Sequence, residues 1–243
     1  MKPGIYKNYH ELSLAAANEI ASLVKSKPTA VLCLASGDTP RLTCKLLAEK
    51  AAEEHINFSQ CTFIGLDEWV GIPPENEGSC HYFFKHNLFD RINFSPANIH
   101  LFNALTDEPL KECAKLDKLI FEKGGIDLII VGVGMNGHIG FNEPGVSFDL
   151  FAHVINLDDI TIAVGQKYFS KPVALKQGIT LGLKHLMQAR KAILMANAVK
   201  KAEVIKRALE EPVSNLFPAG IITMHPNGMV MIDEEAASLL QNK

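Results

Sequence analysis

The apolar positions of this chain fall into two patterns that alternate along its length. Short continuous apolar runs are typical of strands buried on both faces, and segments with apolar residues every three or four positions are typical of helices. The predicted strands cover residues 30–35, 61–66, 126–131, 192–196, 220–224 and 228–232. The predicted helices cover residues 9–25, 41–55, 79–88, 108–122, 199–209 and 234–240.

This alternation predicts an α/β fold, with a mostly parallel sheet that has helices on both faces, as in a Rossmann-like open sheet. We find no strong domain boundary and expect a single domain over residues 1–243. The segment 144–171 has weaker periodicity and several polar breaks, and it directly follows a glycine-rich loop. Two interpretations of this segment are open: a helical lid over a binding site, or an ordinary helical excursion.

The composition argues against several classes of partner. The formal net charge is −3, which gives no general attraction to nucleic acid or to an anionic membrane. No apolar run reaches the roughly 18 residues that a transmembrane helix needs, and the first residues lack the apolar core of a signal peptide. We therefore expect a cytoplasmic protein that acts on a small molecule, without a nucleic-acid or membrane partner.

The cysteines indicate core thiols. Their number, five, is odd, and no two of them have Cys-x-x-Cys spacing, which argues against a disulfide framework or a zinc cluster. They are Cys33, Cys44, Cys61, Cys80 and Cys113. We expect them to be reduced and buried, as free cysteines usually are.

The most informative stretch is the glycine-rich loop at residues 131–145, which directly follows a predicted strand. Polar groups at the carboxyl end of a strand lie where open α/β sheets bind their ligands. The loop carries His138, Glu143, Asn136 and Asn142. A carboxylate beside an imidazole orients the ring and stabilises its protonated form, so the pair favours acid–base catalysis over a structural histidine. A zinc site is less expected, because no second histidine or cysteine stands at ligand spacing.

Residues 36–40, with the sequence Ser-Gly-Asp-Thr-Pro, follow the first predicted strand and open a helix. Thr39 suits the N-cap of that helix, and Pro40 suits its first helical position. Because free N–H groups at the start of a helix favour anions, the turn predicts a phosphate site, and a plain helix cap is the alternative. If phosphate binds here, the carboxylate of Asp38 must point away from it or be neutralised.

Charged residues near other strand ends are further candidates. Asp67 and Glu68 follow the strand at 61–66, and because strand neighbours point to opposite sides, one can face the ligand as a base and the other can be a structural partner. Lys201 lies in the first turn of a predicted helix, where a lysine is useful if it reaches an anion. Lys167, in the candidate lid, could meet that anion from the other side. Solvated surface charge is the alternative in each case.

Together these residues resemble the glucosamine-6-phosphate deaminase (isomerase) family, and the resemblance spans nearly the whole chain. The similar strings begin at Ser36, Leu66, Asn136, Lys176 and Lys201. They read Ser-Gly-Asp-Thr-Pro, Leu-Asp-Glu-Trp-Val-Gly, Asn-Gly-His-Ile-Gly-Phe-Asn-Glu-Pro, Lys-Gln-Gly-Ile-Thr and Lys-Ala. The third string is the most specific. The related 6-phosphogluconolactonases share its glycine–histidine start, but they lack its Phe-Asn-Glu-Pro end and the Asp-Glu-aromatic-Val-Gly string.

The resemblance implies an enzyme of amino-sugar metabolism, a hydrolase, deaminase and isomerase of N-acetylglucosamine catabolism. It would convert a hexosamine 6-phosphate to a ketose 6-phosphate and ammonia, without a metal or an organic cofactor. The resemblance implies that His138 opens the sugar ring, oriented by Glu143 and Asn136. It also implies that Asp67 moves a proton from C2 to C1 before the amine leaves. The substrate-binding residues that it implies are Ser36, Gly37, Asp38, Thr39, Lys167 and Lys201.

Three of these positions depart from the family pattern: Asn136 stands where some members have aspartate, Asp38 where glycine is common, and Lys167 where arginine is frequent. A lysine keeps the charge of arginine but loses its bidentate fork. In regulated members, basic residues after the glycine-rich loop help to bind an allosteric amino-sugar phosphate. His153 and Ile155 stand in for them here, so we expect no such activation.

Several substrates and functions remain open at this point. Glucosamine 6-phosphate is the expected substrate, with fructose 6-phosphate as product. Galactosamine 6-phosphate, with tagatose 6-phosphate as product, is the main alternative. Two more distant alternatives are a lactone esterase of the 6-phosphogluconolactonase type and a non-catalytic sugar-phosphate sensor, the latter motivated by the three departures. The oligomeric state is also open, and a homo-oligomer is among the alternatives.

Overall fold

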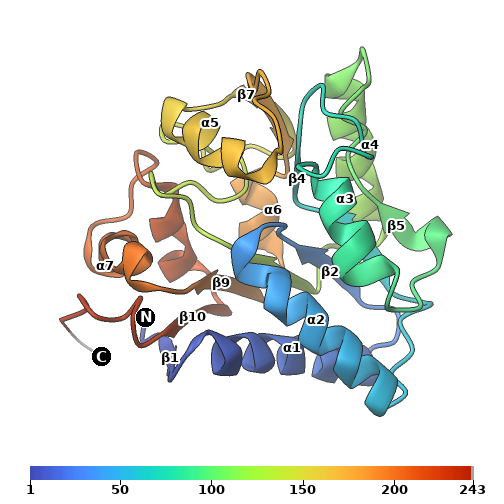
Figure 1. Ribbon diagram of the computed structural model, residues 1–243, viewed down its shortest axis with the longest axis horizontal. Helices are drawn as coiled ribbons and strands as arrows, with labels where there is room; N and C mark the ends of the chain where they lie inside the picture. The colour runs from blue at the N-terminus through green and yellow to red at the C-terminus, as the bar shows by residue number, and fades with distance from the viewer. Residues whose placement is uncertain (242–243) are drawn as a thin grey trace.

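The main sheet has seven strands, and each neighbouring pair runs parallel. In the computed structural model, which describes residues 1–241, the strand order is β1-β10-β9-β6-β2-β3-β5 (Figure 1). The strands are β1 (Gly4–Tyr6), β2 (Val31–Leu34), β3 (Thr62–Gly65), β5 (Ile99–His100), β6 (Leu128–Val131), β9 (Ala192–Ala196) and β10 (Gly228–Asp233). The predicted parallel sheet is therefore confirmed.

Helices cover both faces of this sheet, because successive side chains of each strand point to opposite sides. On β2, Val31 and Cys33 pack into one core, and Leu32 and Leu34 pack into the other. The first core is covered by α4 (Pro109–Glu122), α6 (Leu183–Gln188) and α7 (Ala202–Glu210). The second is covered by α1 (Tyr9–Ser26), α2 (Asp38–Glu53) and α3 (Cys80–Phe84), with α1 and α2 side by side (Figure 1). The expected coverage of both faces is also confirmed.

The strand order creates a crevice near the middle of the sheet. The chain passes from β2 to β3 and β5 in one direction, and it then returns to β6 on the other side of β2. Where the loops after two neighbouring strands run to opposite sides of the sheet, a crevice opens between them at the carboxyl ends of the strands. Open α/β sheets bind ligands in this crevice. The turn at residues 36–40 follows β2 and the glycine-rich loop follows β6, so the topology brings the two motifs together.

A second, antiparallel sheet continues from the end of β3. Its strands are β4 (Asp67–Trp69), β8 (Gln177–Thr180) and β7 (His153–Asn156), in that order. The candidate lid at 144–171 supplies β7, α5 (Asp159–Gly165) and the 3-10 turn Gln166–Tyr168, which lie at the top of Figure 1. Trp69, Phe141 and Leu157 form part of a separate small core beneath these elements. Motion of this segment and the single-domain assignment stay predictions.

Two predicted elements near the carboxyl terminus are wrong. Residues 220–224, expected to be a strand, lie in the 3-10 helix Pro218–Met224, because a short apolar run does not separate strand from buried helix and proline favours a helical first turn. Residues 234–240, expected to be a helix, form successive turns. The carboxylate of Asp233 accepts the N–H of Ala236 at 2.8 Å and also bonds the N–H of Ala198, which ties this segment to the end of β9.

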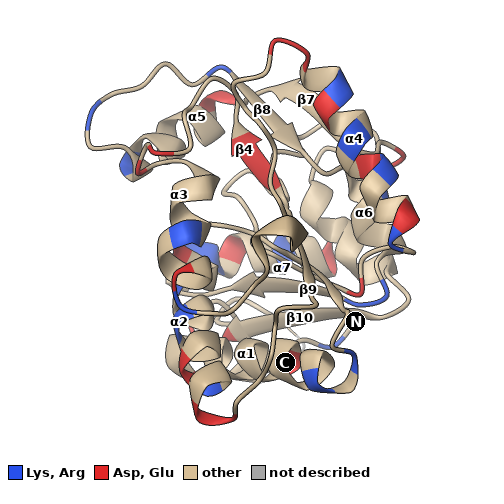
Figure 2. Ribbon diagram, turned by 90° about the vertical axis from the view of Figure 1, so that its right-hand side faces the viewer, with Lys and Arg blue, Asp and Glu red and all other residues tan. Residues whose placement is uncertain are grey.

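Charged residues of both signs occur along the helices that cover the sheet. Figure 2 shows basic and acidic positions interspersed along α1, α2 and α4, whereas the acidic β4 lies inside the fold. Pairs such as Lys118–Glu122 on α4 are exposed, so each adds only a few tenths of a kcal/mol to stability. Within residues 1–241, no helix is both long and apolar enough to cross a membrane.

Candidate active site

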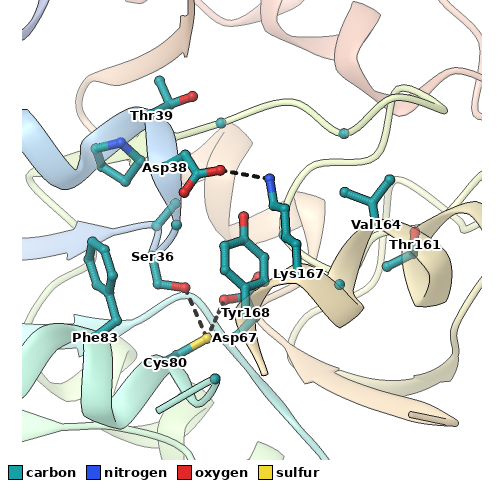
Figure 3. A pocket seen from close by; sticks show the side chains of 18 of the residues that line it. Ser36, Asp38, Thr39, Asp67, Cys80, Phe83, Thr161, Val164, Lys167 and Tyr168 are labelled. Atoms are coloured by element: carbon teal, nitrogen blue, oxygen red, sulfur yellow. Dashed lines mark hydrogen bonds and ion pairs between the residues drawn. The ribbon is translucent and has the colours of Figure 1, made fainter. Parts of the chain in front are cut away.

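A cavity of about 570 Å³ opens at the carboxyl ends of β2, β3, β6 and β9, and residues of α5 close it from the other side (Figure 3). Eight predicted site residues line it: Ser36, Gly37, Asp38, Thr39, Asp67, His138, Lys167 and Lys201. Asn136 and Glu143 are not part of the wall, but both contact His138. The structure therefore brings together side chains from four separate strand ends and the candidate lid.

The turn after β2 leads directly into the long helix α2. Gly37 is the N-cap and has φ of +107°, a conformation that favours glycine, and α2 begins at Asp38. The prediction that Thr39 caps the helix is wrong, because the glycine turn starts the helix earlier; the Thr39 hydroxyl instead donates to Asn197 Oδ1 at 3.1 Å. The first N–H groups of α2, which have no acceptor within the helix itself, thus lie at the cavity edge, where they favour an anion.

The carboxylate of Asp38 is neutralised, as a phosphate site in this turn requires. Lys167 Nζ donates to Asp38 Oδ2 at 2.6 Å (Figure 3), and Arg41 lies 3.8 Å from the other oxygen. Partial burial raises the pKa of Asp38, but the hydrogen bond and charge of Lys167 outweigh it, so the net pKa is lowered. The Tyr9 hydroxyl donates to the carbonyls of Asp38 and Thr39 at 2.7 and 2.9 Å, and this anchors the turn to α1.

Lys201 approaches the same part of the cavity from the end of β9. It is the last residue of the 3-10 turn Val199–Lys201, and α7 begins at Ala202, three residues after the predicted start of this helix at 199. Its Nζ donates to the carbonyl of Val133 at 2.6 Å. Burial first, and the neighbouring charges of Lys200 and Lys167 second, lower the pKa of Lys201 to about 8. A dianion bound here would be attracted by both Lys200 and Lys201, which also line the cavity.

Asp67 and Glu68 point to opposite sides of β4, as strand geometry predicts. Glu68 is 1% exposed, and it accepts the backbone N–H groups of Trp69, Cys80 and His81 at 2.9, 3.0 and 3.0 Å. Asp67 faces the cavity. Burial and the negative charge of Glu68 raise the pKa of Asp67 to about 7, although the Cys80 thiol opposes this rise. A carboxyl that titrates near neutral pH in a cavity is suited to take up and return a proton.

His138 is held by a network behind the cavity wall. Its Nδ1 lies 3.4 Å from Glu143 Oε2 and 3.0 Å from the Thr161 hydroxyl of the candidate lid. Asn136 Nδ2 donates to the same Glu143 oxygen at 2.9 Å, and Asn136 Oδ1 accepts the backbone N–H of His138. Burial raises the pKa of Glu143, but its bond to and charge from His138 outweigh this and lower it. Glu143 therefore stays ionised beside the imidazole, and within residues 1–241 the Nε2 atom of His138, which lines the cavity, has no hydrogen-bond partner.

Glycines allow these groups to come close together. A Cβ on Gly134 would lie 2.3 Å from the ring of His138, and Gly140, with φ of +56°, would place a Cβ 2.8 Å from the Thr180 hydroxyl. Gly140 also lies near Asp67, so it lets the glycine-rich loop pass beside the base. Asn142 has a structural part: its Nδ2 donates to the carbonyls of Ile139 and Leu181, both at 2.9 Å. Among residues 1–241, no cluster of three or more His, Cys, Asp or Glu side chains is placed to hold a metal ion.

Comparison with known proteins identifies the family of this chain. The sequence pattern of the family described as glucosamine-6-phosphate isomerases/6-phosphogluconolactonase matches residues 7–231. The chain belongs to this family. A glucosamine-6-phosphate deaminase of Thermoanaerobacter pseudethanolicus is 39% identical over 244 residues, covering 100% of this chain and 96% of that protein. One of Halothermothrix orenii is also 39% identical, over 241 residues, and is covered completely.

Solved structures of the isomerase/lactonase family agree with this assignment. A monomeric glucosamine-6-phosphate deaminase has a TM-score of 0.95 and 34% identity, covering 98% of this chain and 100% of that one. The 6-phosphogluconolactonase of Trypanosoma brucei has a TM-score of 0.77 at 19% identity over 98% of both chains, a likeness of fold alone. The relatives support a deaminase and isomerase of amino-sugar metabolism, but the expected class of hydrolase is wrong, because they are named as deaminases and not as enzymes of hydrolysis.

Sequence reasoning missed several residues of this family member's cavity. The Thr161 hydroxyl contacts His138 Nδ1. The Tyr168 hydroxyl packs close to Gly37, since a Cβ added to that glycine would lie only 3.1 Å from it. Both lie in the candidate lid, whose weak periodicity gave no sign of which residues point inward. Cys80, expected only to be a buried core thiol, is buried but also lies on the cavity wall beside Asp67. Cys80 falls within the predicted helix at 79–88, but its place on the cavity wall became visible only once α3 was positioned against β4.

Proposed function

We propose that this protein converts glucosamine 6-phosphate into fructose 6-phosphate and ammonia. The observation that carries the proposal is that Asp67 and His138 share one cavity with Lys201 and the start of α2. The reaction needs one group to open the sugar ring, one carboxylate to move a proton between neighbouring carbons, and a cationic site for the phosphate. The names of the relatives over the full chain support the same activity.

The cationic end of the cavity would hold the phosphate. The first N–H groups of α2, Lys200 and Lys201 supply complementary charge. Lys167 contributes by pairing with Asp38, which prevents that carboxylate from repelling the dianion. Binding at this end is remote from C1 and C2. It therefore supplies energy and orientation to the reacting carbons without taking part in their chemistry.

His138 would open the pyranose ring. An imidazole can donate a proton to the ring oxygen and remove one from the anomeric hydroxyl near neutral pH. The ionised carboxylate of Glu143 lies 3.4 Å from Nδ1 of His138, so it stabilises the imidazolium that forms when the imidazole takes up a proton. Asn136 acts through Glu143 and the backbone, so its side chain fixes the geometry of the pair.

Asp67 would carry out the isomerisation. Its carboxylate removes the proton from C2 of the open-chain aldose, which gives an enol-type intermediate, and returns that proton to C1. The C2 imine that results adds water and expels ammonia, which leaves the C2 carbonyl of the ketose. A pKa of about 7 suits both halves of this transfer, because the group must be basic enough to accept the proton and acidic enough to return it.

Parallel assays on three substrates test the proposal. Ammonia release is measured with glucosamine 6-phosphate and with galactosamine 6-phosphate, and acid release is measured with 6-phosphogluconolactone. We expect ammonia from glucosamine 6-phosphate at the highest kcat/KM. Faster turnover of galactosamine 6-phosphate would assign the other hexosamine, and lactone hydrolysis alone would replace the deaminase with an esterase. Tight binding of both sugars without turnover would support the sensor.

The expected absence of allosteric activation is also part of the proposal. His153 and Ile155 lie on β7, and neither side chain is a cation able to pair strongly with a phosphate at neutral pH, since burial lowers the pKa of His153. Rate curves for the hexosamine phosphate should therefore be hyperbolic with or without N-acetylglucosamine 6-phosphate. A sigmoidal curve that this compound made hyperbolic would contradict the expectation. A cytoplasmic location fits a phosphorylated sugar as substrate.

A further inference from the structure

Cys80 lies between the turn after β2 and the carboxylate of Asp67. Its Sγ is 3.5 Å from Asp67 Oδ1, and the Ser36 hydroxyl donates to the same sulfur at 3.0 Å (Figure 3). Figure 3 shows both contacts meeting at the sulfur of Cys80. The thiol therefore joins the region that would hold the phosphate to the group that would move the proton.

The position of the thiol is fixed by the start of α3. The Ser79 hydroxyl caps this helix by accepting the N–H of Tyr82 at 2.9 Å. The backbone N–H of Cys80 donates to Glu68 Oε1, and that of His81 donates to Glu68 Oε2. Cys80 thus contacts both acidic residues of β4, Glu68 through its backbone and Asp67 through its side chain. It cannot move relative to β4 without breaking the bonds to Glu68.

The direction of the two hydrogen bonds is determined by the chemistry of the groups. The thiol is buried next to two carboxylates, and both burial and their charges raise its pKa well above the ordinary value, so it stays protonated. Since the Ser36 hydroxyl donates to the sulfur, the S–H hydrogen is left for Asp67, which accepts it when ionised. A donor to an ionised carboxylate favours the ionised form, opposing burial and Glu68.

We propose that Cys80 is a positioning residue for Asp67: its S–H group holds the carboxylate toward the cavity and stabilises its ionised form, while Ser36 fixes the direction of that donation. The consequence for catalysis rests on the proposed function, in which Asp67 is the base. The contact between Cys80 and Asp67 does not depend on that function, because it can be measured in the protein without substrate. Cys80 would thereby keep the base active at a pH where burial alone would leave it protonated.

Titration of Asp67 in three variants tests the contact. The protein is labelled with 13C in the aspartate carboxyl groups, and the Asp67 signal is assigned as the one lost in Asp67→Asn. Cys80→Ala removes the donor, so the Asp67 pKa should rise by roughly half to one pH unit, as expected for one lost hydrogen bond. Cys80→Ser keeps a hydroxyl donor and should lie closer to the unchanged protein. Cys113→Ala, which removes a buried thiol on α4, is the matched control and should leave the curve unchanged.

Two results would overturn the inference: a Cys80→Ala curve that coincides with that of the unchanged protein, or a Cys80→Ser curve displaced as far as that of Cys80→Ala. The acidic limb of kcat/KM for ammonia release should move with the titration, by about threefold to tenfold in rate at pH 6. If the unchanged protein releases no ammonia, the proposed function fails, and the carboxyl titration still decides whether Cys80 acts on Asp67.

Discussion

Asp67 should destabilise the folded protein at the pH at which it would work. Its pKa is raised from 3.8 to about 7, first by burial and second by the charge of Glu68. In the unfolded chain the carboxyl has its ordinary pKa, so the folded state binds the proton more tightly. Folding stability therefore falls as the pH rises from about 4 to about 7, and the loss is complete above the folded pKa. At 1.36 kcal/mol per pH unit, the rise amounts to about 4 kcal/mol.

Asp67→Asn removes this cost and keeps the shape of the side chain. Because Asp67 retains some contact with the solvent of the cavity, we reduce the expected gain in the free energy of unfolding to roughly 1 kcal/mol at pH 5 and roughly 3 kcal/mol at pH 8. Urea unfolding at the two pH values, followed by far-ultraviolet circular dichroism, measures both gains. The same variant should lose exchange of the C2 proton with solvent and release no ammonia, while it still binds the sugar phosphate.

Glu68→Gln is the matched control, because it makes the same chemical change one residue away. Both oxygens of Glu68 accept backbone N–H groups, so an amide must turn its NH2 group toward at least one donor. This variant should be less stable by about 1 to 3 kcal/mol, the cost of a buried donor without a partner. The reasoning about Asp67 is refuted if its asparagine variant gains the same amount at pH 5 and pH 8, or if it is the less stable protein at pH 8.

Three further predictions concern activity. The pH profile of kcat/KM should rise as Asp67 loses its proton near pH 7 and fall as Lys201 loses its own near pH 8, and a profile that is level from pH 6 to pH 9 would contradict both assignments. Lys201→Met should raise KM by about 10- to 100-fold with a smaller change in kcat, whereas Lys45→Met, on the exposed side of α2, should change neither. If KM is unaltered in Lys201→Met, Lys201 is not part of the phosphate site. Gly78→Ala would place a Cβ 2.3 Å from the ring of Phe169 and should displace the end of the candidate lid, which raises KM and lowers stability by about 1 to 3 kcal/mol. The control Gly220→Ala, with its nearest contact at 3.7 Å, should not raise KM, and equal KM values in the two variants would speak against this displacement.

The central sheet could be predicted because its inner strands are buried on both faces. Such strands appear in the sequence as continuous apolar runs, and the strand expected at 192–196 agrees with β9 at both ends. The strands β1, β4, β5, β7 and β8 contain two to four residues each, too few for a periodic signal. Their backbone is extended because neighbouring strands supply the hydrogen bonds, which only the tertiary structure reveals.

The candidate site could be predicted where its residues follow a strand directly. The turn at 36–40, Asp67 and the glycine-rich loop all do so, and the strand order then brings them into one cavity. The contributions of Thr161 and Cys80 depend on how α5 and α3 pack, and neither helix has a sequence pattern that specifies its rotation. The effect of Asn136 also required coordinates, because it acts on the imidazole through Glu143 and a backbone bond.

The pairing of β1 with β10 has a consequence for how the chain folds. Gly4 lies beside Met231, so the first strand of the sheet is bound to the last. During synthesis, residues 4–6 are made before their partner strand, because Met231 follows Gly4 by 227 positions (231 − 4). This edge of the sheet should therefore form late, because contacts so distant in sequence require a long loop to close. Until β10 pairs with it, β9 has one open edge, whose unpaired backbone groups can associate with strands of other chains unless that edge is covered.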